Sequence, residues 1–285
     1  MERSEPVLPG RHRFVFCGDC CSGVPGAPFE QNFSRVNAVL RQQSPSPDFM
    51  MFLGDHIMGP YAESHPIEDQ WRYWLDNEMA WLDTDRTPIY HCTSNHNTFD
   101  ADAERIWRDV FPNIPRNGPT GQEGLSYWIR RDDLLLVIVN TSFSGLGGNG
   151  HVEREWLEAT LSAHADVRHR IVAGHYPAFP VNGYTEGPDW RIVPDEAEAF
   201  WSVLARHRVL AYLCSHVIAF DLQEHDGVLQ ICSGGAGTNY GPGGFMGEGE
   251  YHHFVRAALD AENFRLETID IEGVVRESFS RTLQP

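Results

Sequence analysis

Short apolar runs recur along the chain and alternate with amphipathic segments, and this alternation limits the folds that the chain can adopt. The runs that we expect to form buried strands are RFVFCG, DFMMFLGD, TPIYHCTS, LLLVIVNTS, HRIVAGH, LAYLCSH, VLQICSGG, HFVRAALD and FRLETIDI. The segments that place apolar residues on one face of a helix are PFEQNFSRVNAVL, VEREWLEATLSAH and DEAEAFWSVLARH. Strands that alternate with helices predict an α/β fold.

The length of the chain bounds the number of domains. A chain of 285 residues can bury a substantial core, and single α/β domains reach this size. Because no internal repeat or linker divides the sequence, we expect one domain over residues 1–285.

The charge and the cysteines restrict the partners and the compartment. Forty acidic residues against 22 basic ones give a net charge of -18, which repels a phosphate backbone and excludes nucleic acid as an expected partner. The start, MERSEPVLPGRHR, has no apolar leader, and no run is long enough to span a membrane. The six cysteines are too sparse for a disulfide framework. We therefore expect a cytoplasmic protein with reduced thiols and no membrane partner.

Five of the predicted strands end in a residue that can bind a metal ion. These residues are Asp19, Asp55, Asn95, His175 and His216. Polar residues at the carboxyl ends of strands gather where α/β folds keep their ligand sites. Carboxylate, amide and imidazole ligands together suit zinc, manganese or iron better than calcium. The sequence therefore predicts a metal site at these strand ends.

The order of these motifs resembles that of the calcineurin-like metallophosphoesterases, and most closely that of the small purple acid phosphatases. The motifs that carry the resemblance are GDCC, GDHIM, SNHN, AGHYP and SHVI, and the similarity runs from about residue 13 to about residue 270. The resemblance implies a four-layer αββα sandwich of two mixed β-sheets flanked by helices. It also implies an enzyme, a metal-dependent hydrolase of phosphate esters.

The resemblance implies two metal positions that share Asp55. One position is completed by Asn95, His175 and His216, all of which are present. The other position keeps only Asp19, because Met58 and Ile218 replace a tyrosine and a histidine of the family pattern. We therefore expect one iron, manganese or zinc ion per chain, although two ions are possible.

Two residues near the altered position are possible additional ligands. Cys21 stands where the broader family has a histidine, and its thiolate could rebuild a softer site with Asp19 and Asp55. His56 is a possible fourth donor. The alternative is that Cys21 packs in a tight turn and that His56 forms a hydrogen bond to a neighbour.

Two residues are candidates for proton transfer. The resemblance assigns His96 to the leaving group or to the transferring phosphoryl group, and it expects a carboxylate one residue later as its partner. Asn97 occupies that position, and its amide lacks the charge that would stabilise an imidazolium. Asp19, if it is free of metal, could act as the general base toward water.

The substrate is expected to be a small, phosphorylated molecule, since the acidic chain disfavours a polyanion. Tyr184, Trp190 and Arg191 follow the His175 motif directly and are candidates for the rim of a pocket. The first hypothesis is hydrolysis of a small phosphate ester with a mononuclear or non-standard metal site. The second is a single-metal enzyme repurposed for oxidation, elimination or isomerisation, and the third is a catalytically silent binding protein.

Overall fold

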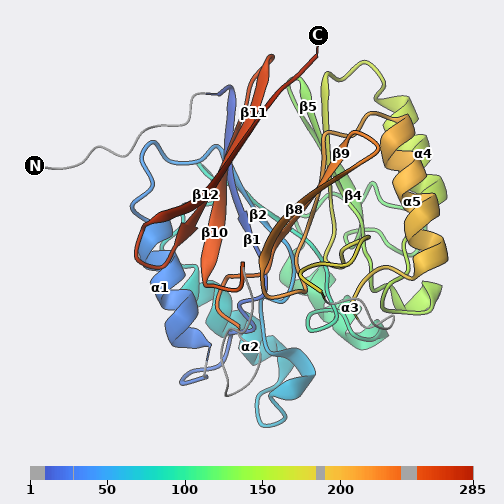
Figure 1. Cartoon of the computed structure of the whole chain (residues 1–285). Coiled ribbons are helices and arrows are strands. Elements are labelled where there is room, and N and C mark those ends of the chain that lie inside the picture. The colour runs from blue at the N-terminus through green and yellow to red at the C-terminus, as the bar shows by residue number, and fades with distance from the viewer. Residues whose placement is uncertain (1–9, 28, 184–189, 239–248, 285) are drawn as a thin grey trace, which may run out of the picture.

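The structure is a computed structural model that describes residues 10–27, 29–183, 190–238 and 249–284. These residues form two six-stranded sheets that face each other (Figure 1). In spatial order, the first sheet holds β12 (Val275–Thr282), β11 (Asn263–Asp270), β10 (His253–Leu259), β1 (His12–Cys17), β2 (Phe49–Phe52) and β3 (Ile89–His91). The second holds β4 (Tyr127–Arg131), β5 (Leu134–Ile138), β6 (His169–Ala173), β7 (Ala211–Cys214), β9 (Val228–Ser233) and β8 (Phe220–His225).

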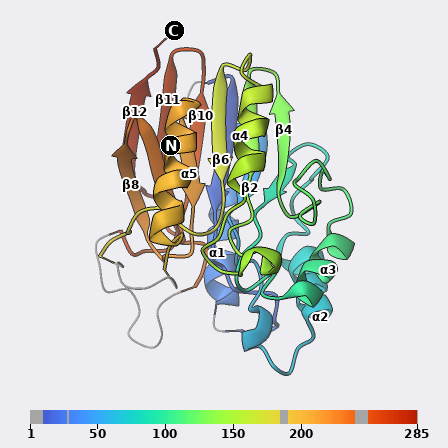
Figure 2. The same ribbon diagram turned by 90° about the vertical axis from the view of Figure 1, so that its right-hand side faces the viewer.

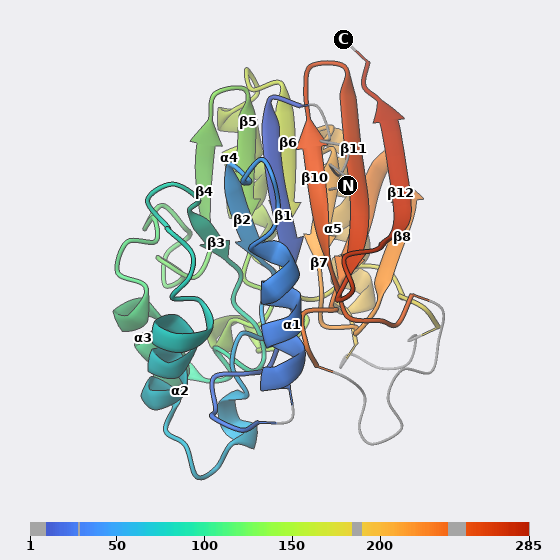
Figure 3. The same cartoon turned by 90° about the vertical axis from the view of Figure 1, so that its left-hand side faces the viewer.

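Helices cover the outer faces of both sheets. The α-helices are α1 (Glu30–Leu40), α2 (Ile67–Tyr73), α3 (Ala101–Val110), α4 (Arg154–Ala163) and α5 (Pro194–Arg206). Shorter helical turns are η1 (Gly59–Tyr61), η2 (Trp74–Glu78) and η3 (Ser144–Leu146). Helices α4 and α5 lie over the second sheet (Figure 2), whereas α1 lies over the first (Figure 3). The predicted four-layer αββα sandwich of two mixed sheets is therefore confirmed.

Three apolar clusters hold these layers together. Phe16 and Leu136 are fully buried between the two sheets. Phe33 of α1 packs against the outer face of the first sheet, and Phe200 of α5 packs against the outer face of the second. The inner strands β1, β2, β5, β6, β7 and β9 run parallel to at least one neighbour and are buried on both faces, which explains their continuous apolar runs.

The predicted strands and helices are confirmed, but three strands were not predicted. Each of the nine predicted runs overlaps an observed strand, and the three predicted helices overlap α1, α4 and α5. The unpredicted strands β4, β8 and β12 are all edge strands. Their sequences mix charged and apolar residues because one side of an edge strand faces solvent.

The loops after β1 and β2 are joined by backbone hydrogen bonds. Asp19 N donates to Gly54 O over 3.1 Å, and Cys21 N donates to Asp55 O over 2.8 Å. These bonds continue the pairing of the two strands beyond their ends, so the side chains of both loops keep fixed relative positions. In the described part of the chain, no helix has the length and apolar character that crossing a bilayer requires.

Candidate metal centre

The backbone of the strand-end loops adopts an uncommon conformation at the predicted ligands. Asp19, Asp55 and His216 have φ angles of 64°, 53° and 69°, and Cys21 has 42°. Left-handed geometry is costly for residues other than glycine and clusters at functional sites. These four account for half of the eight such residues in the described chain. The uncommon backbone conformations therefore coincide with the loops that carry these four side chains.

His175 is held in a single orientation at the centre of the site. Its Nδ1 lies 2.9 Å from Leu53 O and 3.0 Å from Ser215 Oγ. Because a carbonyl oxygen only accepts hydrogen bonds, Nδ1 carries the ring proton and Nε2 keeps its lone pair. Gly54 makes this approach possible, since a Cβ there would lie 2.5 Å from His175 Nδ1 and its φ is +106°.

Three donor atoms converge around Nε2 of His175, which is the fourth. It lies 2.9 Å from Asn95 Oδ1, 3.1 Å from His216 Nδ1 and 3.4 Å from Asp55 Oδ1. Ligands bonded to one ion at about 2.1 Å are about 3.0 Å apart at right angles and about 3.4 Å apart in a tetrahedron. The arrangement therefore fits a single metal ion held by Asp55, Asn95, His175 and His216.

The electrostatics of the site suit metal ligands. Burial alone would raise the pKa of Asp55, but the nearby rings of His175, His96 and His216 hold the pKa of this carboxyl well below its usual value. Burial lowers the pKa of His175, which favours its neutral form. An anionic carboxylate and a neutral imidazole are the forms that bind a metal ion.

Asp19 lies at the pocket, outside both groups of closely spaced donor atoms. Its Oδ2 accepts a hydrogen bond from the backbone N of His216 over 2.8 Å. Burial and the neighbouring carboxylate of Asp55 raise the pKa of Asp19. One oxygen of the carboxyl is thus fixed beside the candidate ligand His216 at the pocket.

The side of the pocket opposite His175 has a different character. Met58 and Ile218 line it, and these are the two positions at which the sequence analysis expects a tyrosine and a histidine from the resemblance. The Cys21 thiol faces this side, 3.9 Å from Asp55 Oδ2, whereas the Cys20 thiol donates to His56 O over 2.9 Å and does not line the pocket. Burial, Asp55 and Asp19 raise the pKa of Cys21.

His56 lies away from the pocket, in a buried aromatic cluster. Its ring stacks on Phe52 with 4.2 Å between centroids. Its Nε2 lies 3.0 Å from His91 Nδ1, and its Nδ1 lies 3.3 Å from Asn97 Oδ1. Both ring nitrogens therefore have protein partners, and the structure does not bring His56 together with the other candidate ligands.

Asn97 pairs with His56 and Ser94 and not with His96. Its Oδ1 accepts from the backbone N of His56 over 3.0 Å and from Ser94 Oγ over 2.7 Å. The expectation that it partners His96 is therefore wrong. Ser94 Oγ in turn accepts from Asp55 N over 2.9 Å, so the amide supports the loop that carries Asp55.

His96 faces Asp55 from the altered side of the pocket. Its Nδ1 lies 2.9 Å from Met58 O, and its Nε2 lies 3.7 Å from Asp55 Oδ2. The exposed Tyr61 ring lies 4.8 Å from the imidazole, between centroids. The partner that orients His96 is thus a backbone carbonyl, which leaves Nε2 directed at Asp55.

The site opens into a cavity of about 310 Å³. Of the predicted rim residues, Trp190 lines the cavity, Arg191 donates to Ala178 O over 3.5 Å and does not line it, and Tyr184 lies outside the described residues. The lining residues that the sequence analysis missed are Phe29, Tyr61 and Thr238. Each lies on a loop or a short turn, where no periodic pattern marks a side chain as facing a site.

The comparison with known families agrees with this geometry. The family described as "Calcineurin-like phosphoesterase" matches residues 12–220. This span contains Asp19, Asp55, Asn95, His175 and His216. The chain belongs to the calcineurin-like phosphoesterase family. It is a metal-dependent hydrolase of phosphate esters, and the converging donor atoms fit the divalent or trivalent ions of such enzymes.

Individual relatives support the same assignment. Tartrate-resistant acid phosphatase type 5 from Sus scrofa is 25% identical over 289 residues, which cover 90% of this chain and 78% of that protein. A dimetal phosphatase from Danio rerio superposes with a TM-score of 0.68 at 16% identity, covering 96% of this chain and 99% of the other.

A purple acid phosphatase from yellow lupin (Lupinus luteus) seeds also shares the fold. It superposes with a TM-score of 0.66 at 16% identity and covers 95% of this chain. This chain spans only 53% of the lupin protein. At these identities the two structural likenesses show the fold alone.

Proposed function

We propose that the chain hydrolyses a small phosphate monoester with one resident metal ion, held by Asp55, Asn95, His175 and His216. The observation that carries the proposal is the convergence of these four donors on one point, with separations of 2.9 to 3.4 Å from His175 Nε2. A protein that only binds a partner has no need of such a set.

When bound, the ion would supply a water of lowered pKa and a positive charge for the phosphate. We assign the general base to Asp19, whose Oδ2 is fixed by the backbone N of His216. The second oxygen can take a proton from the attacking water. His96 lies on the other side of Asp55 and donates from Nε2 to the phosphoryl group or to the leaving oxygen.

The pocket favours a small substrate with an apolar part. Its volume is about 310 Å³, and the aromatic residues Phe29, Tyr61 and Trp190 line it together with Met58. A net charge of -18 disfavours a polyanionic polymer. We include Tyr184, together with Trp190, as a residue that contacts the substrate, but not Arg191, because its guanidinium donates to Ala178 O away from the cavity lining.

Turnover of para-nitrophenyl phosphate tests the proposal. The wild type is expected to release the phenol, and His216→Ala is expected to lose both turnover and metal. Asp19→Asn distinguishes a role of Asp19 as general base from a role as metal ligand. As a base, Asp19 is needed for turnover but not for metal binding, so turnover should fall while the metal content stays unchanged. Full turnover in Asp19→Asn would remove the base assignment.

A second candidate function is single-metal chemistry on a substrate without phosphate. Met58 and Ile218 at the pocket favour it, because a site without their expected ligand types neutralises less negative charge. A protein with a full metal complement and no turnover of any phosphate ester would favour this candidate over the first.

The cellular location is part of the proposal. All six cysteines are free thiols in the structure. Reduced thiols are typical of the cytoplasm, and we propose that the enzyme acts there as a single domain.

A further inference from the structure

Cys21 is held rigidly against Asp55. Its backbone N donates to Asp55 O over 2.8 Å, and the next residue, Ser22, donates to His56 O over 3.0 Å. These two bonds fix the Cys21 loop against the Asp55 loop on both sides of the thiol. The Cys21 side chain is only 3% exposed, so its Sγ stays 3.9 Å from Asp55 Oδ2.

His96 directs its Nε2 at the same carboxylate oxygen. Its Nδ1 faces the carbonyl of Met58 over 2.9 Å, and a carbonyl oxygen only accepts, so Nδ1 carries a proton. The other ring nitrogen, Nε2, lies 3.7 Å from Asp55 Oδ2. A ring N–H donated to a backbone carbonyl is also the usual support of a histidine that binds a metal.

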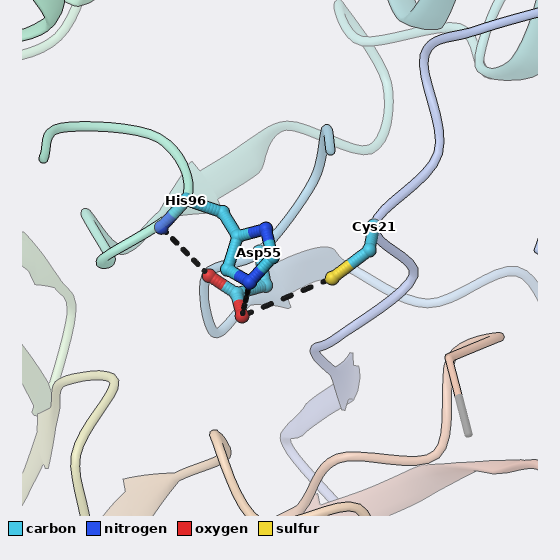
Figure 4. A group of neighbouring side chains, drawn as sticks. All are labelled: Cys21, Asp55 and His96. Atoms are coloured by element: carbon cyan, nitrogen blue, oxygen red, sulfur yellow. Dashed lines mark hydrogen bonds and ion pairs between the residues drawn. The ribbon is translucent and has the colours of Figure 1, made fainter. Parts of the chain in front are cut away.

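Cys21 and His96 both direct a donor atom at the Asp55 carboxylate (Figure 4). Zinc binds sulfur at about 2.3 Å and nitrogen or oxygen at about 2.1 Å, so tetrahedral neighbours are roughly 3.6 Å apart for S and O and roughly 3.4 Å apart for N and O. The structure has 3.9 and 3.7 Å for these pairs, and all three donor atoms lie within 4.8 Å of one another. For the two pairs that involve Asp55, shifts of a few tenths of an ångström would reach the tetrahedral spacing.

We propose that Cys21, Asp55 and His96 form a second cation site, selective for a thiophilic divalent ion such as zinc. The site shares Asp55 with the resident ion. His96 serves as a ligand there, because Met58 and Ile218 stand where the resemblance expects a tyrosine and a histidine. Binding replaces the thiol proton by the metal–sulfur bond and releases that proton to solvent.

The second site changes the role of His96, and this consequence rests on the proposed function. An ion on Nε2 of His96 removes that nitrogen from the substrate. A thiophilic cation added beyond the resident ion is therefore expected to inhibit the phosphatase, with one cation bound per chain.

Cobalt(II) titration of the protein as purified tests the site directly. A cobalt–thiolate bond gives a charge-transfer band in the near ultraviolet, which carboxylate and imidazole ligands lack. We expect the band to saturate at one added equivalent in the wild type. Cys21→Ser is expected to abolish the band, and His96→Ala to weaken cobalt binding by about tenfold or more.

Cys20→Ser is the matched control. Its thiol is the chain neighbour of Cys21 but donates to His56 O away from the pocket, so the band should persist. Elemental analysis of each variant before the titration shows whether the resident ion, and with it the fold of the site, is retained. A wild type without the band, or a band that survives in Cys21→Ser, would overturn the proposal.

The same titration separates this inference from the proposed function. The band without any turnover of a phosphate ester would leave the cation site intact and remove the hydrolase proposal. Turnover without the band would do the reverse. A band accompanied by undiminished turnover would support the site and remove His96 as the acid.

Discussion

The two sides of the pocket share Asp55 but differ in every other donor. On one side, His175 Nε2 has Asn95 Oδ1 and His216 Nδ1 within 3.1 Å. On the other side, the residues at the positions of the expected ligands are Met58 and Ile218, and the nearby donors are a thiol and His96. The proposed function interprets this difference as one metal position kept complete beside a rebuilt neighbour, which is feasible because only one carboxylate joins them.

The largest expected effect comes from removing a ligand on the complete side. His175→Ala should lower turnover of an aryl phosphate by about a thousandfold, since a lost ion removes several kcal/mol of transition-state stabilisation. Ile218→Ala, on the altered side, should change turnover by less than about tenfold. Steady-state kinetics of both variants measures the contrast, and equal losses would mean that the two sides contribute alike.

A glycine variant tests whether the complete side depends on close packing. Gly54→Ala would place a Cβ 2.5 Å from His175 Nδ1 and should weaken metal binding by about ten- to a hundredfold. Gly26→Ala is the matched control, because its φ of +73° is also left-handed but a Cβ there meets nothing within 4 Å. Competition with a chelator measures the affinity, and unchanged affinity in Gly54→Ala would contradict the packing account.

Restoring the family residues should make the two sides alike. Met58→Tyr combined with Ile218→His should raise metal occupancy from about one ion per chain toward two, because both side chains line the pocket beside Asp55. Elemental analysis of the desalted variant and wild type, both purified without added metal, checks this. Occupancy that stays at one would show that more than these two ligands separates the sides.

The smallest expected effect concerns the buried histidines behind the altered side. Burial lowers the pKa of His91 from 6.5 to about 3, so below pH 6.5 the unfolded chain binds a proton that the folded chain does not. The free energy of unfolding should therefore fall as the pH drops from about 6.5 toward 3, with a slope of up to about one proton from this residue.

His91→Gln measures that contribution. Denaturant unfolding at several pH values should show a shallower acid dependence in the variant than in the wild type. An identical dependence would mean that His91 is protonated in the folded state. The His56 ring, which contacts His91, shares the lowered pKa through burial and the neighbouring His91 charge, so part of the slope should remain.

The sequence predicted the buried strands and the complete side of the site for one physical reason. Central parallel strands are buried on both faces and leave a continuous apolar run, and the ligand stands directly at the end of the run. The edge strands β4, β8 and β12 mix charged and apolar residues and leave no such run, so they were not predicted.

The side-chain directions could not be predicted from the sequence. Asp55 and His56 are adjacent, yet one faces the pocket and the other lies among aromatic rings contributed by distant segments. Cys20 and Cys21 differ in the same way. Tyr61 reaches the pocket from a short turn, where no periodicity indicates its direction. These orientations depend on tertiary contacts, which the apolar pattern of one strand does not indicate.

The metal content of the protein as purified, without added metal, tests the central claim most directly. Elemental analysis of a desalted sample should find about one ion per chain, held by Asp55, Asn95, His175 and His216, and His175→Ala should retain almost none. No ion in the wild type, or an ion that remains in His175→Ala, would contradict the account of one complete and one rebuilt side.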